Sequence, residues 1–168
     1  GMKNKAMTKH RPRIPVLARG RVLEVGMGSG LNIPWYDQKV THLFGLEPST
    51  VLQAEAAELA AASKTPFPVE FLTAGAESIP LERSSMDCVV RTWTLCSLPD
   101  LDVALAEIRR VLKPDGQLLF LDHGRAPDAA VARWQDRLAP VFRGLAGCNP
   151  NRQIDASIEA AGFRFTAM

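Results

Sequence analysis

The strongest constraint on the fold is a repeated alternation between short apolar runs and longer segments with helical character. Five runs have the length and the β-forming residues of strands: residues 21–26, 43–47, 69–72, 86–91 and 117–122. Strands that alternate with helices form parallel sheets, because parallel neighbours need long crossover connections. The sequence therefore predicts an α/β fold with a doubly wound, mostly parallel sheet and helices on both faces.

Two of the helical segments carry clear signals for where they begin and end. Ser49 is a good N-cap residue for a helix that runs to about residue 63, and Asp100 is one for a second helix. The apolar stripe of the second helix consists of Leu101, Leu105, Ile108 and Leu112. Residues 113–116 contain proline and glycine, so we expect the helix to end there.

Length and composition favour one globular domain. The chain has 168 residues, of which 46% are hydrophobic and 23% charged, which excludes disordered, collagen-like and coiled-coil classes. No apolar run approaches the roughly 18 residues of a membrane-spanning helix, and no signal-peptide pattern is found. We therefore expect a cytoplasmic protein whose contact with membranes is at most peripheral.

Charge is distributed unevenly along the chain. Seven of the 20 lysines and arginines precede Glu24, the first acidic residue, so the remainder carries 13 basic against 18 acidic side chains. An acidic body argues against a nucleic-acid partner. We predict a basic, flexible N-terminal segment at residues 1–20 and a single folded domain at residues 21–168.

The three cysteines do not suggest a cross-linked or metal-binding protein. Cys88, Cys96 and Cys148 are odd in number and widely spaced, so they form neither a disulfide framework nor a Cys-x-x-Cys metal site. We predict no metal, and we expect Cys88, which lies inside an apolar strand, to belong to the core.

The loop after the first strand is rich in glycine. In a doubly wound sheet ligands bind beyond the carboxyl ends of the strands, where Gly26, Gly28 and Gly30 let the backbone pass close to a ligand. We also expect this loop to open a helix. A dinucleotide fingerprint would need glycine at position 31, where this chain has Leu31. This favours a small polar ligand over a pyrophosphate and argues against the alternative of an NAD-dependent oxidoreductase.

Acidic residues lie at or after the ends of the first three predicted strands. Glu24 points toward the glycine loop and would attract an ammonium group, and Glu47 is placed to accept hydrogen bonds from both hydroxyls of a ribose. Glu77 lies beside the backbone of Gly75 and Ala76, where a base edge could be read. These residues suit a ligand with one ammonium group, one ribose and no phosphate.

Three side chains with chemical potential follow the fourth and fifth strands. Trp93 and Cys96 come after the fourth strand and His123 after the fifth, so all three converge on the edge of the sheet that holds the glycine loop. Each also has a structural interpretation: Trp93 as core, Cys96 as a small buried hydrophobe and His123 as a hydrogen-bonded structural histidine.

Together these segments resemble the class I S-adenosylmethionine-dependent methyltransferases of the methyltransferase type 11 group, in the small-molecule branch that includes ubiquinone biosynthesis enzymes. The motifs that carry the resemblance are residues 22–30 (VLEVGMGSG), 46–49 (LEPS), 76–80 (AESIP), 87–90 (DCVV) and 107–116 (EIRRVLKPDG). A narrower likeness, to bacterial relatives of the membrane-associated alkyl thiol methyltransferases, is carried by residues 92–97, 122–124, 133–135 and 147–152. The resemblance covers residues 15–166.

The resemblance implies a Rossmann-like fold that binds S-adenosyl-L-methionine and releases S-adenosyl-L-homocysteine. The residues that it implies for cofactor binding are Glu24, Gly26, Gly28, Gly30, Asn32, Glu47, Pro48, Gly75, Ala76, Glu77, Arg91, Thr92 and Trp93. It implies an acceptor pocket at Trp93, Cys96 and His123. We expect a small, fairly apolar acceptor, with thiol sulfur favoured over phenol or quinol oxygen, and His123 as the base that takes the thiol proton.

The chain departs from the family pattern in three places. Many members carry an acid at the position of Gly75, so adenine recognition is left to the backbone and Glu77. Only about 20 residues precede the first strand, where the family has a helical cover. Residues 162–168 are predicted to form the sixth strand, and the seventh, antiparallel strand is missing. These departures keep open a truncated fragment, a non-catalytic S-adenosylmethionine-binding protein, and a homo-oligomer that completes the site.

Overall fold

A five-stranded sheet forms the centre of the computed structural model, which describes residues 11–92, 100–121 and 154–166 and seven residues between 128 and 138. The strands are β1 (Gly20–Val25), β2 (Val40–Leu46), β3 (Val69–Leu72), β4 (Met86–Thr92) and β5 (Leu112–Leu121). The helices are α2 (Thr50–Ser63), α3 (Leu101–Val111) and α5 (Ile154–Ala160), and the 3-10 turns are η1 (Arg11–Arg13), η2 (Pro15–Leu17) and η3 (Ile33–Trp35).

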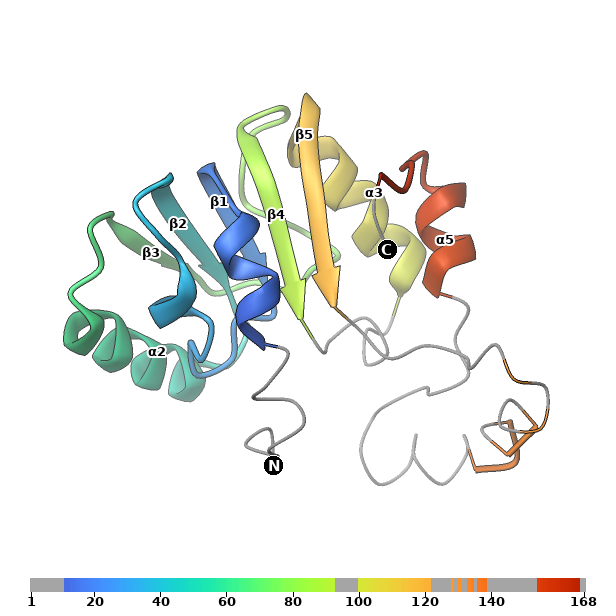
Figure 1. Ribbon diagram of the computed structural model, residues 1–168, viewed down its shortest axis with the longest axis horizontal. Helices are drawn as coiled ribbons and strands as arrows, with labels where there is room; N and C mark the ends of the chain where they lie inside the picture. The colour runs from blue at the N-terminus through green and yellow to red at the C-terminus, as the bar shows by residue number, and fades with distance from the viewer. Residues whose placement is uncertain are drawn as a thin grey trace.

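The sheet is parallel throughout, with the strand order β3-β2-β1-β4-β5 (Figure 1). From β1 the chain first builds outward through β2 and β3, and then returns to add β4 and β5 on the other side of β1. The order therefore reverses between β1 and β4, and this switch point is where doubly wound sheets bind their ligands. The predicted doubly wound parallel sheet is confirmed.

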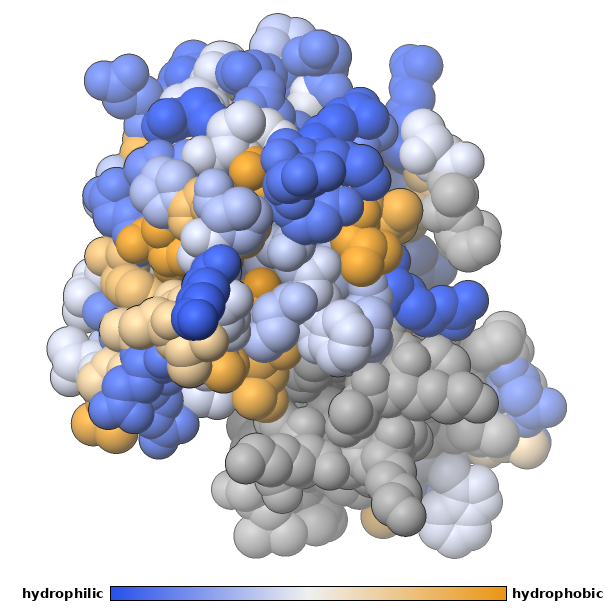
Figure 2. Space-filling view, turned by 60° about the vertical axis from the view of Figure 1, so that its left-hand side comes forward, coloured by the Kyte–Doolittle hydropathy of each residue, from blue (hydrophilic) through white to orange (hydrophobic). Residues whose placement is uncertain are grey.

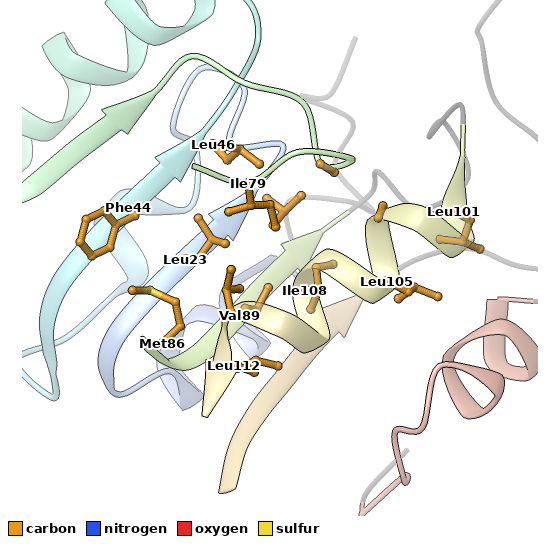
Figure 3. Close-up of a cluster of buried hydrophobic side chains, with 14 of the residues drawn as sticks. Leu23, Phe44, Leu46, Ile79, Met86, Val89, Leu101, Leu105, Ile108 and Leu112 are labelled. Atoms are coloured by element: carbon orange, nitrogen blue, oxygen red, sulfur yellow. The ribbon is translucent and has the colours of Figure 1, made fainter. Parts of the chain in front are cut away.

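Helices cover both faces of the sheet, as predicted. On one face, Leu23 of β1 and Val89 of β4 share a core cluster with Leu105 and Ile108 of α3, and Figure 3 shows Leu23, Val89 and Ile108 gathered between the strands and this helix. The other face packs against α2 and η3 through a separate cluster that includes Val22, Leu43, Cys88, Ile33 and Ala56. Because successive residues of a strand face opposite sides, β1 supplies Val22 to one cluster and Leu23 to the other.

Both predicted N-caps are confirmed. The hydroxyl of Ser49 accepts a hydrogen bond from the backbone N–H of Leu52 at the start of α2, and the carboxylate of Asp100 accepts one from Val103 at the start of α3. Helix α2 is rich in alanine and buries Ala56 completely. Figure 2, which brings the α2 side of the molecule forward, shows hydrophobic residues interspersed with hydrophilic ones over this face.

The end of α3 differs from the prediction. The helix stops at Val111, and Leu112, predicted as the last residue of the helical stripe, is the first residue of β5. Leu112 pairs with Met86 of β4, and the next paired residue is Gln117, which pairs with Cys88. The proline- and glycine-containing residues 113–116 therefore end the helix as expected, but they form a bulge within a longer strand rather than a turn before it.

Two further predicted elements are absent from the described residues. The glycine loop leads into the single 3-10 turn η3, which contains Pro34, rather than into an α-helix. Residues 162–166, predicted as part of a sixth strand, form no strand, and residues 167–168 lie outside the described part. Phe163 and Phe165 instead pack against the core beside α3 and α5, with the rings of Phe165 and Phe120 6.0 Å apart. Side-chain packing holds this segment in place of a strand ladder.

The described part of the predicted basic segment is packed rather than extended away from the domain. Pro15 in η2 and Ala18 are buried against the face that α2 covers. Residues 1–10 lie outside the described part, so the domain boundary at residue 21 stays a prediction. In the part of the chain that the structure describes, no helix has both the length and the apolar character needed to cross a membrane.

Candidate functional site

The carboxyl ends of β1, β2 and β4 bring buried polar residues together at the switch point. Glu24 is the next-to-last residue of β1 and lies between Gly45 of β2 and Val90 of β4 in the sheet register. Its side chain is only 2% exposed. Arg91 and Thr92 at the end of β4 are also buried, and so is Glu47 directly after β2. Burying this many polar groups is costly unless they are hydrogen-bonded.

The glycine loop is attached to the end of β2 by three hydrogen bonds. The backbone N–H groups of Gly26 and Met27 both donate to the carbonyl oxygen of Leu46, at 2.9 and 3.1 Å. The N–H of Gly28 donates to the carboxylate of Glu47, at 3.0 Å. The loop therefore has a defined path over the carboxyl end of β2, beside the predicted ribose-binding acid.

The glycines at positions 28 and 30 serve different purposes. Both have positive φ, +57° and +75°, a conformation that residues with a side chain rarely adopt. A Cβ at Gly28 would meet nothing within 4 Å, so this glycine borders open space. A Cβ at Gly30 would come within 2.7 Å of Ile33 and 2.9 Å of Ala56. Gly30 thus lets α2 pack closely, whereas Gly28 leaves the loop open to a ligand.

Glu24 and three other buried side chains, Asn32, Tyr36 and Thr92, form a hydrogen-bonded cluster. Asn32 donates from Nδ2 to Oε1 of Glu24 at 2.7 Å and to Oγ1 of Thr92 at 2.9 Å, so it joins the ends of β1 and β4. Tyr36 donates from its hydroxyl to Oε2 of Glu24 at 2.8 Å. Burial, together with the charge of Glu24, raises the pKa of Tyr36 well above its usual value. The phenol therefore keeps its proton and acts as a donor.

Tyr36 is the residue of this cluster that sequence reasoning missed. It lies 12 positions after Glu24, beyond the turn η3, and no periodic pattern or motif marks it. The signal that could have found it is the need for a donor: a buried carboxylate at the end of a strand requires partners, and Tyr36 is the one tyrosine of the chain.

Glu47 is held by the backbone on two sides. Its two carboxylate oxygens accept from the N–H groups of Gly28 and Ser49, each at 3.0 Å. Gln53 of α2 donates to the carbonyl oxygen of Glu47 at 2.5 Å and to the hydroxyl of Thr73 at 3.0 Å. Gln53 therefore ties the ends of β2 and β3 together, which places the loop after β3 next to the Glu47 site.

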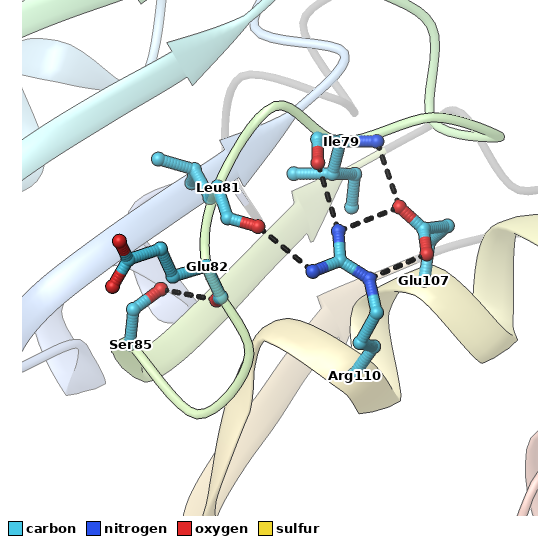
Figure 4. Close-up of polar contacts among 6 residues, drawn as sticks. All are labelled: Ile79, Leu81, Glu82, Ser85, Glu107 and Arg110. Atoms are coloured by element: carbon cyan, nitrogen blue, oxygen red, sulfur yellow. Dashed lines mark hydrogen bonds and ion pairs between the residues drawn. The ribbon is translucent and has the colours of Figure 1, made fainter.

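The loop after β3 is anchored by an ion pair on α3 (Figure 4). Arg110 donates to the carbonyl oxygens of Ile79 and Leu81, both at 2.8 Å, and to the carboxylate of Glu107 at 2.6 and 2.8 Å. Glu107 in turn accepts from the N–H of Ile79 at 2.9 Å. The hydrogen bond from Arg110 lowers the pKa of Glu107, so the pair is ionised near neutral pH. The backbone that follows Glu77 is thus fixed.

The surroundings of Glu77 give the most direct indication of where a ligand binds. Its carboxylate lies over Gly75, where a Cβ would come within 2.9 Å of Oε2. Among the described residues no donor reaches Oε1, although this oxygen is buried. A buried acceptor without a partner is costly in the free protein and is expected to be satisfied by a ligand. An exocyclic amino group such as that of adenine has the required N–H.

The remaining predicted residues fall into two groups. Pro48 is exposed and Ala76 buried beside the Glu77 loop, while Trp93, Cys96 and His123 lie outside the described residues. The prediction that Cys88 belongs to the core is confirmed: it is buried in β4, and burial raises its pKa from 9.0 to about 12.

A separate groove of about 810 Å³ lies near the amino ends of β4 and β5, between α3 and α5. Its lining includes both members of the Glu107–Arg110 ion pair, together with Arg83, Asp102 and Arg109, so its charge is mixed. None of the predicted site residues lines it. Because doubly wound sheets bind ligands at the opposite ends of their strands, we place the candidate site at Glu24, Glu47 and Glu77.

Comparison with known sequences identifies the family of the chain. Residues 23–120 match the profile of a family described as "Methyltransferase domain". The chain is 34% identical to the rat protein named thiol S-methyltransferase TMT1B over 147 residues, which cover 84% of this chain and 59% of the rat protein. It is 38% identical to the ubiquinone/menaquinone biosynthesis C-methyltransferase UbiE of Hahella chejuensis over 68 residues, 40% of this chain and 27% of that protein. The chain spans less than two thirds of the length of these relatives.

Solved structures share the fold. The YcgJ protein of Bacillus subtilis superposes with a TM-score of 0.73 over 86% of this chain and 62% of that protein, at 24% identity. At this identity the likeness establishes the arrangement of the sheet and helices alone.

Proposed function

The chain belongs to the methyltransferase domain family, and on this premise we propose that it transfers a methyl group from S-adenosylmethionine to a small, fairly apolar acceptor. The observation that carries the proposal is the set of three carboxylates, Glu24, Glu47 and Glu77, which lie at or after the carboxyl ends of the three neighbouring strands β1, β2 and β3. Their order in the sheet suits an extended ligand with donor groups at three separate points.

Each carboxylate is assigned one donor group of the cofactor. Glu24 would bind the ammonium group of the methionine part and Glu47 the ribose hydroxyls. Oε1 of Glu77, which no donor of the described residues reaches, would bind the adenine amino group. Hydrogen bonds to a charged acceptor contribute roughly 1.5 to 3 kcal/mol each. When bound, S-adenosylmethionine supplies a methyl group activated by a sulfonium. The open space beside Gly28 leaves room for the methionine part.

The chain's own contribution to the reaction is to position the acceptor and to exclude water. Methyl transfer is an in-line displacement, which gains most from holding the two reacting groups close and aligned. We propose that the acceptor enters at the end of β4, where Arg91 and Thr92 are buried next to the Glu24 cluster.

We propose a thiol as the preferred acceptor and a phenol or quinol as the second choice. The likeness to a protein named thiol S-methyltransferase supports the thiol; the shorter likeness is to a protein named a C-methyltransferase and does not by itself support an oxygen acceptor. A thiol with a pKa near 8.5 must lose its proton before it attacks, and His123 is the proposed base. His123→Gln should then lower turnover and change its pH profile; an unchanged profile would remove the histidine from the mechanism.

The direct test is a transfer assay on the full chain. The protein is incubated with S-adenosylmethionine and, separately, an alkane thiol, a phenol and a quinol, and methylated products are measured by mass spectrometry. We expect product with the thiol and a loss of at least tenfold in Glu47→Gln. The matched control is Glu70→Gln on β3, which changes an exposed acid outside the site. Cofactor binding without any methylated product would favour a non-catalytic S-adenosylmethionine-binding protein.

A further inference from the structure

The buried cluster around Glu24 contains one member, Tyr36, that is not among the residues predicted for the site from the sequence. Tyr36 donates to Oε2 of Glu24 while Asn32 donates to Oε1, so the two oxygens of the carboxylate are held by different side chains. Tyr36 is 6% exposed and Asn32 1%. The carboxylate is therefore fixed in orientation from both sides, in a place that bulk water does not reach.

The position of Tyr36 is set by local packing rather than by the hydrogen bond alone. The turn η3 brings the chain back over the sheet, and the backbone N–H of Tyr36 donates to the carbonyl oxygen of Ile33 at 3.3 Å. Its ring meets the ring of Phe67 edge to face, with centroids 6.5 Å apart. A phenylalanine could make the same ring contacts. The hydroxyl is thus the part of the side chain that the packing does not require.

We propose that Tyr36 is a positioning residue, whose hydroxyl holds the Glu24 carboxylate in the orientation that binds the ammonium group of the cofactor. The inference rests on the proposed function. A carboxylate offers about four lone-pair sites and can accept from several donors at once, and the hydrogen bonds from Tyr36 and Asn32 set the orientation of Glu24. Tyr36 touches neither the cofactor nor the reacting atoms and acts through Glu24.

The cluster also couples this subsite to the place where the acceptor enters. Asn32 spans the switch point from Glu24 in β1 to Thr92 in β4, with donor–acceptor distances of 2.7 and 2.9 Å. If the phenol is removed, the carboxylate can rotate, and the geometry of the Asn32 bridge changes with it. Tyr36 therefore contributes to the alignment of two sites without lining either.

The test compares two ligands that differ in the group that Glu24 recognises. S-adenosylhomocysteine carries the ammonium group, whereas 5′-methylthioadenosine retains the adenine, the ribose and the sulfur but lacks the amino-acid part. Calorimetric titration of Tyr36→Phe should show affinity for S-adenosylhomocysteine lowered roughly 5- to 20-fold, and affinity for 5′-methylthioadenosine within about twofold of the unmodified chain. A residue with only a structural role would change both affinities or neither.

If Tyr36→Phe folds poorly, the double variant E24Q/Y36F still tests the proposal. Glu24→Gln removes the buried charge of the carboxylate, so the protein no longer needs the Tyr36 hydroxyl as a donor to that charge. We expect its preference for S-adenosylhomocysteine over 5′-methylthioadenosine to equal that of Glu24→Gln alone. A further drop in the double variant, or unchanged binding of S-adenosylhomocysteine to Tyr36→Phe, would overturn the role of Tyr36. Failure of the unmodified chain to bind either ligand would instead overturn the proposed function, and the role of Tyr36 with it.

Discussion

At the scale of single residues, the candidate site consists of acids whose surroundings differ. Glu24 and Glu47 each accept at least two hydrogen bonds from neighbouring groups, whereas Oε1 of Glu77 has no donor among the described residues. The carboxylates of Glu24 and Glu47 are therefore held in position by donors of the protein before a ligand binds. Of the three acids, Glu77 should gain the most hydrogen-bond energy when a ligand binds.

Replacing Glu77 should separate binding from stability. Glu77→Ala is expected to lower the affinity for S-adenosylhomocysteine about 10-fold or more, because a hydrogen bond to a charged acceptor is lost. The melting temperature of the free protein should be unchanged or higher, because the substitution removes a buried oxygen that has no donor in the part of the chain that the structure describes. Glu82→Ala, an exposed acid shortly after it in the chain, is the control. A lower melting temperature with unchanged affinity would show that Glu77 is a structural residue.

The buried thiol of Cys88 predicts how stability depends on pH. An unfolded chain loses the thiol proton near pH 9, whereas the folded protein holds it until about pH 12. The unfolded state therefore binds fewer protons in this window, so the stabilisation present below pH 9 is lost as the pH rises toward 12. The raised pKa of Tyr36 acts in the same direction.

Urea unfolding at pH 8 and pH 10.5 measures this effect. We expect Cys88 to account for a loss of about 2 kcal/mol in the free energy of unfolding between these values. Cys88→Ala is less stable at both pH values, because a core side chain is shortened, but it should lose less on going to pH 10.5. An equal loss in both proteins would contradict the burial of the thiol.

Members of the candidate site were predictable from the sequence where a motif or a strand end marks them. Glu24 and Glu47 lie at strand ends as expected, and both are buried. The role of Tyr36 was not predictable, because the turn that carries it has no periodicity and the partner that requires it lies in another element. A hydrogen bond between distant residues depends on three-dimensional placement, which local patterns do not encode.

At the scale of elements, the helix starts were the most predictable feature and the end of α3 the least. Ser49 and Asp100 begin helices because their side chains satisfy free backbone N–H groups, which is a local property. The continuation of Leu112 into β5 depends on its pairing with Met86, which is a contact between elements. Likewise, residues 162–166 have a strand-like composition but pack through Phe163 and Phe165 instead of pairing.

The anchor between α3 and the Glu77 loop gives a prediction at this scale. Arg110→Ala removes hydrogen bonds to Ile79, Leu81 and Glu107 and should lower the free energy of unfolding by about 2 to 3 kcal/mol. The affinity for S-adenosylhomocysteine should fall as well, because the backbone that follows Glu77 loses its support. Urea unfolding and calorimetry measure the two effects.

Arg109→Ala is the matched control for this experiment. Arg109 is the adjacent residue on α3, is exposed, and lies over the ring of Phe163 at 5.9 Å. Such a contact at an exposed site contributes about 0.5 to 1 kcal/mol, so we expect a smaller loss of stability and no change in affinity. Equal effects of the two substitutions would mean that the hydrogen bonds of Arg110 do not hold the loop.

At the scale of the whole molecule, the alternation of strands and helices was sufficient to predict the parallel sheet and its two covered faces. Right-handed crossovers leave few arrangements of such a sheet. The observed strand order then locates the switch point between β1 and β4. The acceptor was not predictable to the same degree, because chemistry depends on the particular side chains around a shared fold. The identity of the methyl acceptor is therefore to be determined by assays and not from the topology of the sheet.

The central claim is that the carboxyl ends of β1, β2 and β3 form a binding site for S-adenosylmethionine. Calorimetric titration of the full chain with S-adenosylhomocysteine tests it most directly, with NAD as the control ligand. We predict micromolar binding of S-adenosylhomocysteine, about −8 kcal/mol, and no binding of NAD. Binding of NAD in preference, or of neither ligand, would contradict the account.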